Sequence, residues 1–254
     1  MKNKKVWGAA LLTLVVLAFA GTGIWLAVSR GNDPEPVADE VAEKTDGQRF
    51  KESYESLNAT IRESDGATYQ TITIDENNPI KYISITEMLK VMDDENAVIY
   101  VGGNWCPWCR NAVPVLLEVA KEFGVDKLYY VELDDDKSMF EVQDGQLVKT
   151  KEGSEAYYKL LERMGDRLAQ YSLTDKDGKK YPTGETRMSV PYVIGVNGGE
   201  IVAQKKGTVK LDEGQTKYDP MTSEQKKQMR EDYRKVFEAA LGKKADDCDE
   251  ICTE

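Results

Sequence analysis

The sequence predicts an α/β domain with a central mixed sheet flanked by helices. Two observations carry this prediction. A short apolar run at 97–101, rich in β-branched residues, is typical of a buried strand, and a helical pattern follows it directly. Two more strand segments, 190–196 and 200–205, precede a helix over 223–241. Strands that alternate with helices in this way are typical of a layered α/β domain.

The other elements follow from capping and alternation patterns. The turn Asn197-Gly198-Gly199 joins the two late strands, and Gly242 ends the last helix. The pattern Ser84-Ile85-Thr86-Glu87 is a capping box that marks a helix start. The remaining expected elements are a helix over 49–63, a strand over 68–74, a helix over 85–93, a helix ending near 123 and a strand over 127–133.

A long insertion, residues 134–187, separates the early strands from the late hairpin. One stretch in it, about 155–171, has a clear helical pattern, so we expect a helical insertion before the late strands. The predicted order is β-α-β-α-β, the insertion, and then β-β-α. The expected domain therefore spans 49–242.

The composition sets limits on the function. The chain has 254 residues, enough for one sizeable domain with attachments, and its net charge is −11. Residues 1–30 carry four cations and no acids, which leaves 30 Lys and Arg against 45 Asp and Glu, a net charge of −15, on the rest. Such a chain would repel phosphates, so we expect no nucleic-acid partner. The absence of His excludes Ser-His-Asp catalysis, Cys-His catalysis and His-ligated metal sites.

The N-terminal residues 1–30 predict a membrane anchor. Residues 6–29 carry no charge and are long enough for a helix to span the roughly 30 Å hydrocarbon core. Three lysines precede this run and favour an N-in, C-out orientation, with the domain on the extracytoplasmic side of the cell membrane. The alternative is a signal peptide cleaved after Ala18-Phe19-Ala20, which would also export the domain. The acidic residues 31–48 are the expected linker.

The motif Cys106-Pro107-Trp108-Cys109 carries the chemistry. It lies where the expected strand 97–101 leads into a helix, so Cys106 meets the positive end of the helix dipole and unpaired backbone N–H groups. Both stabilise a thiolate, which is the nucleophile of disulfide exchange. The two-residue spacing lets Cys109 reach back within one helical turn. We therefore expect an exposed Cys106 as the nucleophile and a shielded Cys109 as the resolving thiol.

Other roles for these cysteines stay open. The pair could form half of a four-cysteine zinc site, which would need Cys248 and Cys252 as well. It could also form a purely structural disulfide. We expect neither a metal nor a cofactor at the site, because an exported compartment favours disulfide chemistry over zinc.

The acidic tail, residues 243–254, contains the two remaining cysteines, Cys248 and Cys252. Its composition is typical of a mobile extension. One hypothesis is that these cysteines form a second redox pair that exchanges electrons with Cys106 and Cys109. The alternative is a local structural disulfide, or a disulfide that ties the tail to the domain.

The residues around the motif resemble the thioredoxin superfamily. Residues 98–109 look like that family's active-site strand and loop, and Pro114 falls where the family often has a helix-kinking proline. The segment Ser189-Val190-Pro191-Tyr192-Val193 resembles its cis-proline loop, and residues 197–202 resemble the hairpin that follows. The resemblance covers about 68–242, apart from the insertion.

The resemblance implies a thioredoxin-like fold and a thiol–disulfide oxidoreductase. The pattern over 106–110 is similar to that of membrane-anchored thioredoxin-like proteins of Gram-positive bacteria, some of which are bacteriocin transport accessory proteins. The implied partners are exported proteins or peptides that carry thiols or disulfides, and a membrane electron-transfer partner. A module that only holds its partner, without turnover, is the alternative. The residues expected at the site besides the cysteines are Pro191, Trp105, Pro107, Trp108 and Val190.

The sequence departs from the thioredoxin pattern at two positions. Tyr100 stands where thioredoxins have the buried acid that accepts the proton of the resolving thiol, and Glu132 stands where they have a lysine. By alignment Glu132 is the nearest replacement for that acid, and burial would suit it to acid–base work. The alternative is an exposed carboxylate at a strand end. Pro107, after the first cysteine, is shared with glutaredoxins and DsbA-type oxidases, but it does not fix the direction of electron flow.

Overall fold

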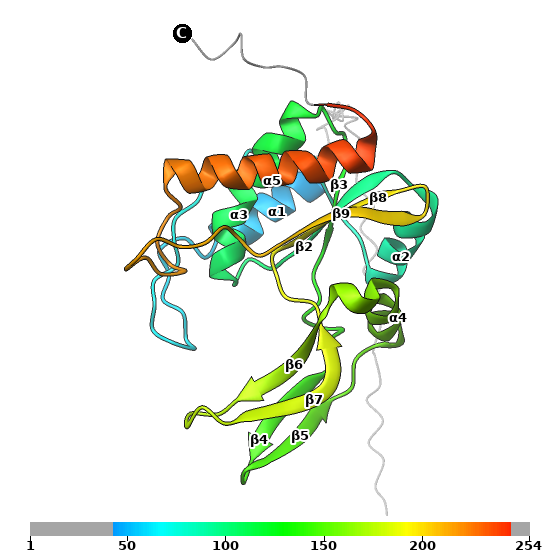
Figure 1. Ribbon diagram of the computed structural model, residues 1–254. Helices are drawn as coiled ribbons and strands as arrows, with labels where there is room; N and C mark the ends of the chain where they lie inside the picture. The colour runs from blue at the N-terminus through cyan, green and yellow to red at the C-terminus, as the bar shows by residue number, and fades with distance from the viewer. Residues whose placement is uncertain (1–42, 245–254) are drawn as a thin grey trace, which may run out of the picture. The chain divides into compact units, whose positions relative to one another are not determined.

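The computed structural model describes residues 43–244, and its centre is a five-stranded sheet in the order β1-β3-β2-β8-β9 (Figure 1). β3 is parallel to β1 and β2, whereas β8 is antiparallel to both of its neighbours, β2 and β9. The predicted central mixed sheet is therefore confirmed. Its strands are β1 (Ile80–Tyr82), β2 (Ala97–Val101), β3 (Leu128–Val131), β8 (Tyr192–Asn197) and β9 (Glu200–Lys206).

Helices cover the sheet, and most of them begin at a hydroxyl cap. The described residues form α1 (Asp46–Glu55), α2 (Ile85–Asp94), α3 (Pro107–Glu122), α4 (Glu155–Met164) and α5 (Ser223–Leu241). In four of them a Ser or Thr side chain accepts a hydrogen bond from a backbone N–H of the first turn, which would otherwise lack a partner inside the helix. These caps are Thr45, Ser84, Ser154 and Thr222. Gly242 ends α5 with a φ of 64°, as its position in the sequence predicted.

The two faces of the sheet carry two separate hydrophobic cores, because side chains alternate along each strand. Val98 and Tyr100 of β2 pack on one face with buried residues of α1, α3 and α5. Ile99 and Val101 pack on the other face with buried residues of α2 and α4. This arrangement confirms that helices flank the sheet, and it sets α3 against the face that carries Tyr100.

The segment before the sheet differs from the prediction. The expected helix over 49–63 is α1, which begins at Asp46 and ends at Glu55, so the end of the expected linker 31–48 belongs to this helix. Thr45 and Gln48 form a capping box that starts the helix at Asp46, three residues before the start that the apolar pattern predicts.

The predicted strand over 68–74 is wrong. This segment makes one isolated bridge, between Thr68 and Ile61, and joins no sheet. Residues 59 and 60 bond the backbone of Tyr69, and side chains bond the backbone farther along, so a sheet partner is not needed to satisfy these polar groups. The bonds join Arg110 to the Gln70 carbonyl, Asn58 to the carbonyl and N–H of Ile72, and Lys51 to the Ile74 carbonyl. The first strand is β1.

The insertion is partly helical, as expected, but it also holds two hairpins that were not predicted. The expected helix over 155–171 ends at Met164, because Gly165 adopts a φ of 51°. A short 3-10 helix, Gly165–Arg167, follows, and the chain enters a strand at Ala169. The hairpins extend away from the central sheet in Figure 1. They consist of β4 (Met139–Gln143) with β5 (Gln146–Lys151), and β6 (Ala169–Thr174) with β7 (Lys180–Arg187).

Two predictions fall on residues that the structure does not describe. The anchor at 6–29 and the cysteine-containing part of the tail both lie outside residues 43–244. Within those described residues, no helix combines the length and the apolar character that a membrane span requires.

Candidate functional site

The two cysteines sit at the junction between β2 and α3. Cys106 is the N-cap of α3, and Pro107 occupies the first turn, where the missing N–H of a proline has no cost. The Cys106 sulfur accepts a hydrogen bond from the backbone N–H of Cys109, with 3.4 Å between nitrogen and sulfur. Both thiols are free. The predicted strand-to-helix placement of the motif is confirmed.

The expectation of an exposed Cys106 is wrong, although the two cysteines still differ in access. Cys106 is 3% exposed and Cys109 is fully buried. Cys106 borders a pocket of 340 Å³, whereas Cys109 does not. The sulfur of Cys106 is covered because it lies 3.7 Å from the carbonyl oxygen of Val190. A substrate would therefore reach Cys106 through this pocket.

The surroundings of the pair favour a thiolate on Cys106 and a thiol on Cys109. The hydrogen bond with the Cys109 thiol lowers the pKa of Cys106, and the backbone N–H groups of Cys109 and Trp108 and the cation of Arg62 add to this against the opposing effect of burial. Burial raises the pKa of Cys109 well above its usual range, and its bond with Cys106 acts in the same direction. These surroundings favour the charged form of Cys106 over that of Cys109, which is the difference that a nucleophile and a resolving thiol would require.

Cys106 should be alkylated over a lower pH range than an ordinary cysteine. Alkylation requires the thiolate, so the rate rises as pH increases through the pKa. We expect half-maximal reactivity of Cys106 with iodoacetamide below the value of about 8.5 for a free cysteine. Cys109→Ala should move the midpoint upward, because it removes the thiol that donates to Cys106. Peptide mapping by mass spectrometry gives the rates, and a midpoint equal to that of free cysteine would contradict the assignment.

The loop before β8 closes the site from the other side. The Val190–Pro191 peptide bond is cis, as the sequence predicts. Pro191 is buried, and its carbonyl accepts a hydrogen bond of 2.8 Å from the N–H of Gly207. The antiparallel pairing of β2 with β8 aligns Val101 with Tyr192, which brings this loop beside the start of α3.

The pocket beside Cys106 combines indole rings with cations. Trp105 is 40% exposed, and its N–H donates to the Asp134 carboxylate. Lys137 lies over its ring, 5.3 Å from the centroid, and Arg62 donates to its carbonyl at 2.8 Å. The charged residues that line the pocket are Arg62, Lys137, Arg187, Lys217 and Asp134. The pocket is thus locally cationic in a chain whose net charge is −11.

These cations could not be predicted to lie together, because they come from segments far apart in the chain. Arg62 follows α1, Lys137 and Arg187 belong to the insertion, and Lys217 precedes α5. Only Arg187 could have been placed near the site from the sequence, because it stands a few residues before the predicted cis-proline. The residues predicted for substrate binding, Trp105, Pro107, Trp108 and Val190, all line the pocket.

Glu132 is exposed, as in the alternative of a carboxylate at a strand end, so burial does not prepare it for acid–base work. The physical reason is that β3 ends at Val131 and the chain leaves the sheet at this residue. Its carboxylate nevertheless accepts a hydrogen bond of 2.7 Å from the hydroxyl of Tyr130, which is fully buried. Glu132 therefore lies where the buried Tyr130 hydroxyl meets the surface.

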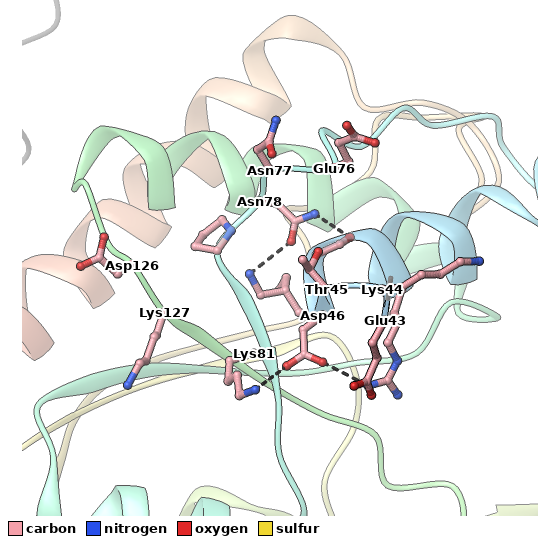
Figure 2. A pocket seen from close by; sticks show the side chains of 14 residues that line it. Glu43, Lys44, Thr45, Asp46, Glu76, Asn77, Asn78, Lys81, Asp126 and Lys127 are labelled. Atoms are coloured by element: carbon pink, nitrogen blue, oxygen red, sulfur yellow. Dashed lines mark hydrogen bonds and ion pairs between the residues drawn. The ribbon is translucent and has the colours of Figure 1, made fainter. Parts of the chain in front are cut away.

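A larger depression, of 790 Å³, lies beside the N-terminus of α1 and contains no cysteine (Figure 2). Its charges pair with one another, since Asp46 contacts Lys81 at 2.9 Å and Arg49 at 3.1 Å. Asn78 donates to the carbonyl of Gly47 at 3.0 Å. This depression offers no reactive group.

Within the described part of the chain, no group of three or more His, Cys, Asp or Glu side chains is arranged to hold a metal ion. The four-cysteine zinc alternative involves Cys248 and Cys252, which lie outside that part.

Comparisons with known proteins add no family to this description. No family model matches the chain, and neither the curated proteins nor the solved structures contain a significant match.

Proposed function

We propose that this protein is a thioredoxin-like thiol–disulfide oxidoreductase whose redox pair is Cys106 and Cys109. One observation carries the proposal. The Cys106 sulfur caps α3, 3.4 Å from the N–H of Cys109, and it lies 3.7 Å from the carbonyl of Val190, which precedes the cis-proline Pro191. A nucleophilic sulfur, a second thiol one turn away and an adjoining pocket are the parts that disulfide exchange requires.

The reaction runs in two exchanges. The Cys106 thiolate attacks one sulfur of the substrate disulfide, so that a mixed disulfide forms and the other substrate sulfur leaves as a thiolate and takes a proton. The Cys109 thiolate then attacks the Cys106 sulfur, which releases the second substrate thiol and forms the Cys106–Cys109 disulfide. The substrate gains two electrons and the pair loses two. The reverse sequence oxidises a dithiol, and the relative reduction potentials decide the direction.

The proposal includes the location and partners of the protein. Residues 6–29 anchor it in the cell membrane with the domain on the extracytoplasmic side, where exported proteins or peptides supply disulfides or thiols. A membrane electron-transfer partner restores the pair after each cycle. The insertion contributes Lys137 and Arg187 to the pocket, so it belongs to the surface that the substrate meets.

Turnover with a disulfide substrate tests the proposal. With dithiothreitol as reductant, the protein should accelerate the reduction of insulin, and Cys106→Ser should abolish the acceleration. The matched control is Cys248→Ser/Cys252→Ser, which removes the same kind of group outside the pair and should keep the rate. No acceleration by the unaltered protein would identify a binding module without turnover. Full activity of Cys106→Ser would show that the pair is not responsible.

A further inference from the structure

The resolving thiol is enclosed, and it must lose a proton before it reacts. Cys109 is fully buried in the core between β2 and the helices α1, α3 and α5. Only its thiolate can attack the mixed disulfide. Among the described residues, the one buried carboxylate is Glu122, and it is paired with Arg230 and Arg234 at 2.6 Å each. Glu122 is also 13 residues along α3 from Cys109, about 20 Å at 1.5 Å per residue.

Three buried tyrosines lead from Cys109 to the surface. Tyr100, on β2, packs in the same buried core as Cys109, and its hydroxyl lies 3.0 Å from the hydroxyl of Tyr54, on α1. Tyr130, on β3, packs in the same core beside Tyr100 and Tyr54. Tyr130 donates to the carboxylate of the exposed Glu132 at 2.7 Å. The tyrosines thus form a contiguous buried cluster between Cys109 and the exposed Glu132 carboxylate, with hydrogen bonds between Tyr54 and Tyr100 and between Tyr130 and Glu132.

The fold holds this cluster in place. All three tyrosine side chains are fully buried, and the rings of Tyr100 and Tyr130 are stacked with centroids 5.3 Å apart. Gly102 leaves room for the Tyr100 hydroxyl, because a Cβ at this position would lie 2.2 Å from its oxygen. Packing alone would be served equally well by phenylalanine, which has no hydroxyl to accommodate.

We infer that Tyr100, Tyr54 and Tyr130 relay the Cys109 proton to Glu132 when Cys109 resolves the mixed disulfide. The inference rests on the proposed function. Each hydroxyl accepts one proton from the cysteine side and passes its own toward the surface, so that Cys109 loses a proton, Glu132 gains one and no tyrosine changes its charge. Glu132 then releases the proton to water. After the transfer, the O–H of Tyr100 points at the new thiolate and stabilises it.

The electrostatics of the cluster fit a concerted transfer. Burial raises the pKa of Tyr54, Tyr100 and Tyr130 well above the usual range, so none of them holds a negative charge. The other titratable groups near the sulfur are the Cys106 thiol and Tyr233, on α5. The hydroxyl of Tyr233 is buried and has no hydrogen-bond partner within residues 43–244.

The relay can be tested by timing the two exchanges separately. Cys248→Ser/Cys252→Ser protein is mixed with a symmetric aromatic disulfide whose thiolate product is coloured. The first coloured thiolate reports the attack by Cys106, and the second reports resolution by Cys109. Tyr100→Phe should slow the second phase about 100-fold near neutral pH, within the range typical of general acid–base catalysis. Its rate should then increase steeply with pH, because hydroxide must replace the relay.

Two further variants make the outcome decisive. Glu132→Gln changes an exposed residue and should also slow the second phase. Tyr233→Phe is the matched control, because it removes a buried hydroxyl that has no partner in the described chain, and it should leave both phases unchanged. If Tyr100→Phe and Glu132→Gln both behave like Tyr233→Phe, the relay is wrong and the proposed function stands. If the unaltered protein releases no second thiolate, the proposed function itself fails.

Discussion

Cys109→Ser protein is expected to stall with its substrate attached to Cys106. Cys106 can still attack a disulfide, because it remains at the N-terminus of α3, but the thiol that would release the substrate is gone. Turnover of insulin should fall to the uncatalysed rate. Mixed disulfides should accumulate, visible on non-reducing gels and as cross-linked peptides in mass spectrometry.

The trapping experiment also fixes the roles of the two cysteines. Cys106→Ser, which exchanges the same atom at the other position, should trap nothing, because Cys109 is fully buried and its pKa is raised. Accumulation of mixed disulfides in Cys106→Ser, and none in Cys109→Ser, would reverse the assignment. Identification of the trapped proteins from membranes would give the natural substrates.

Arg110→Met is expected to destabilise the protein more than Arg110→Lys or the surface substitution Arg49→Met. The Arg110 side chain is fully buried, and its guanidinium donates to the backbone of three segments instead of to a carboxylate. Replacing it with Met leaves these acceptors without a donor in the core, and we expect the free energy of unfolding to fall by about 3–5 kcal/mol. The acceptors are the carbonyls of Gln70, Tyr54 and Asn104 and the side-chain oxygen of Asn58, at 2.5–3.3 Å.

Urea denaturation measures this effect, and a surface arginine provides the control. Arg49→Met removes an arginine whose side chain is 56% exposed and paired with Asp46, so it should cost less than about 1 kcal/mol. Arg110→Lys keeps the charge but cannot reach several acceptors at once, and it should fall between wild type and Arg110→Met. An Arg110→Met protein as stable as Arg49→Met would show that the buried guanidinium is not a structural anchor.

The sequence predicted best those elements whose signals are local. The apolar run of β2, the hairpin at Asn197-Gly198-Gly199 and the last helix all appear close to the expected residues. The placement of Cys106 at the start of α3 also followed from the strand that precedes it.

The errors arose where distant residues decide the structure. Residues 68–74 have a strand-like pattern, but the side chains of Arg110, Asn58 and Lys51 bond their backbone. No local sequence pattern reveals that these side chains take the place of a neighbouring strand. The predicted helix in the insertion is too long, because the apolar pattern continues past Gly165, whereas the helix ends at Met164 with this glycine as its C-cap.

In the site, too, contacts between residues distant in the sequence could not be predicted. Tyr100 was recognised as a departure from the thioredoxin pattern, but its connection to Tyr54 and Tyr130 depends on packing between α1, β2 and β3. Glu132 was found by alignment, and its hydrogen bond with Tyr130 gives it a contact that its exposure alone would not suggest. Spatial proximity of this kind cannot be read from one sequence.

The most direct test of the central claim is the redox equilibrium of the pair. The full chain is equilibrated in mixtures of reduced and oxidised dithiothreitol and glutathione, alkylated, and mapped by mass spectrometry. We expect a single reversible transition in which Cys106 and Cys109 become linked to each other. Cysteines that stay unlinked at every ratio, a linkage that no ratio reduces, or pairing only with Cys248 or Cys252 would contradict it.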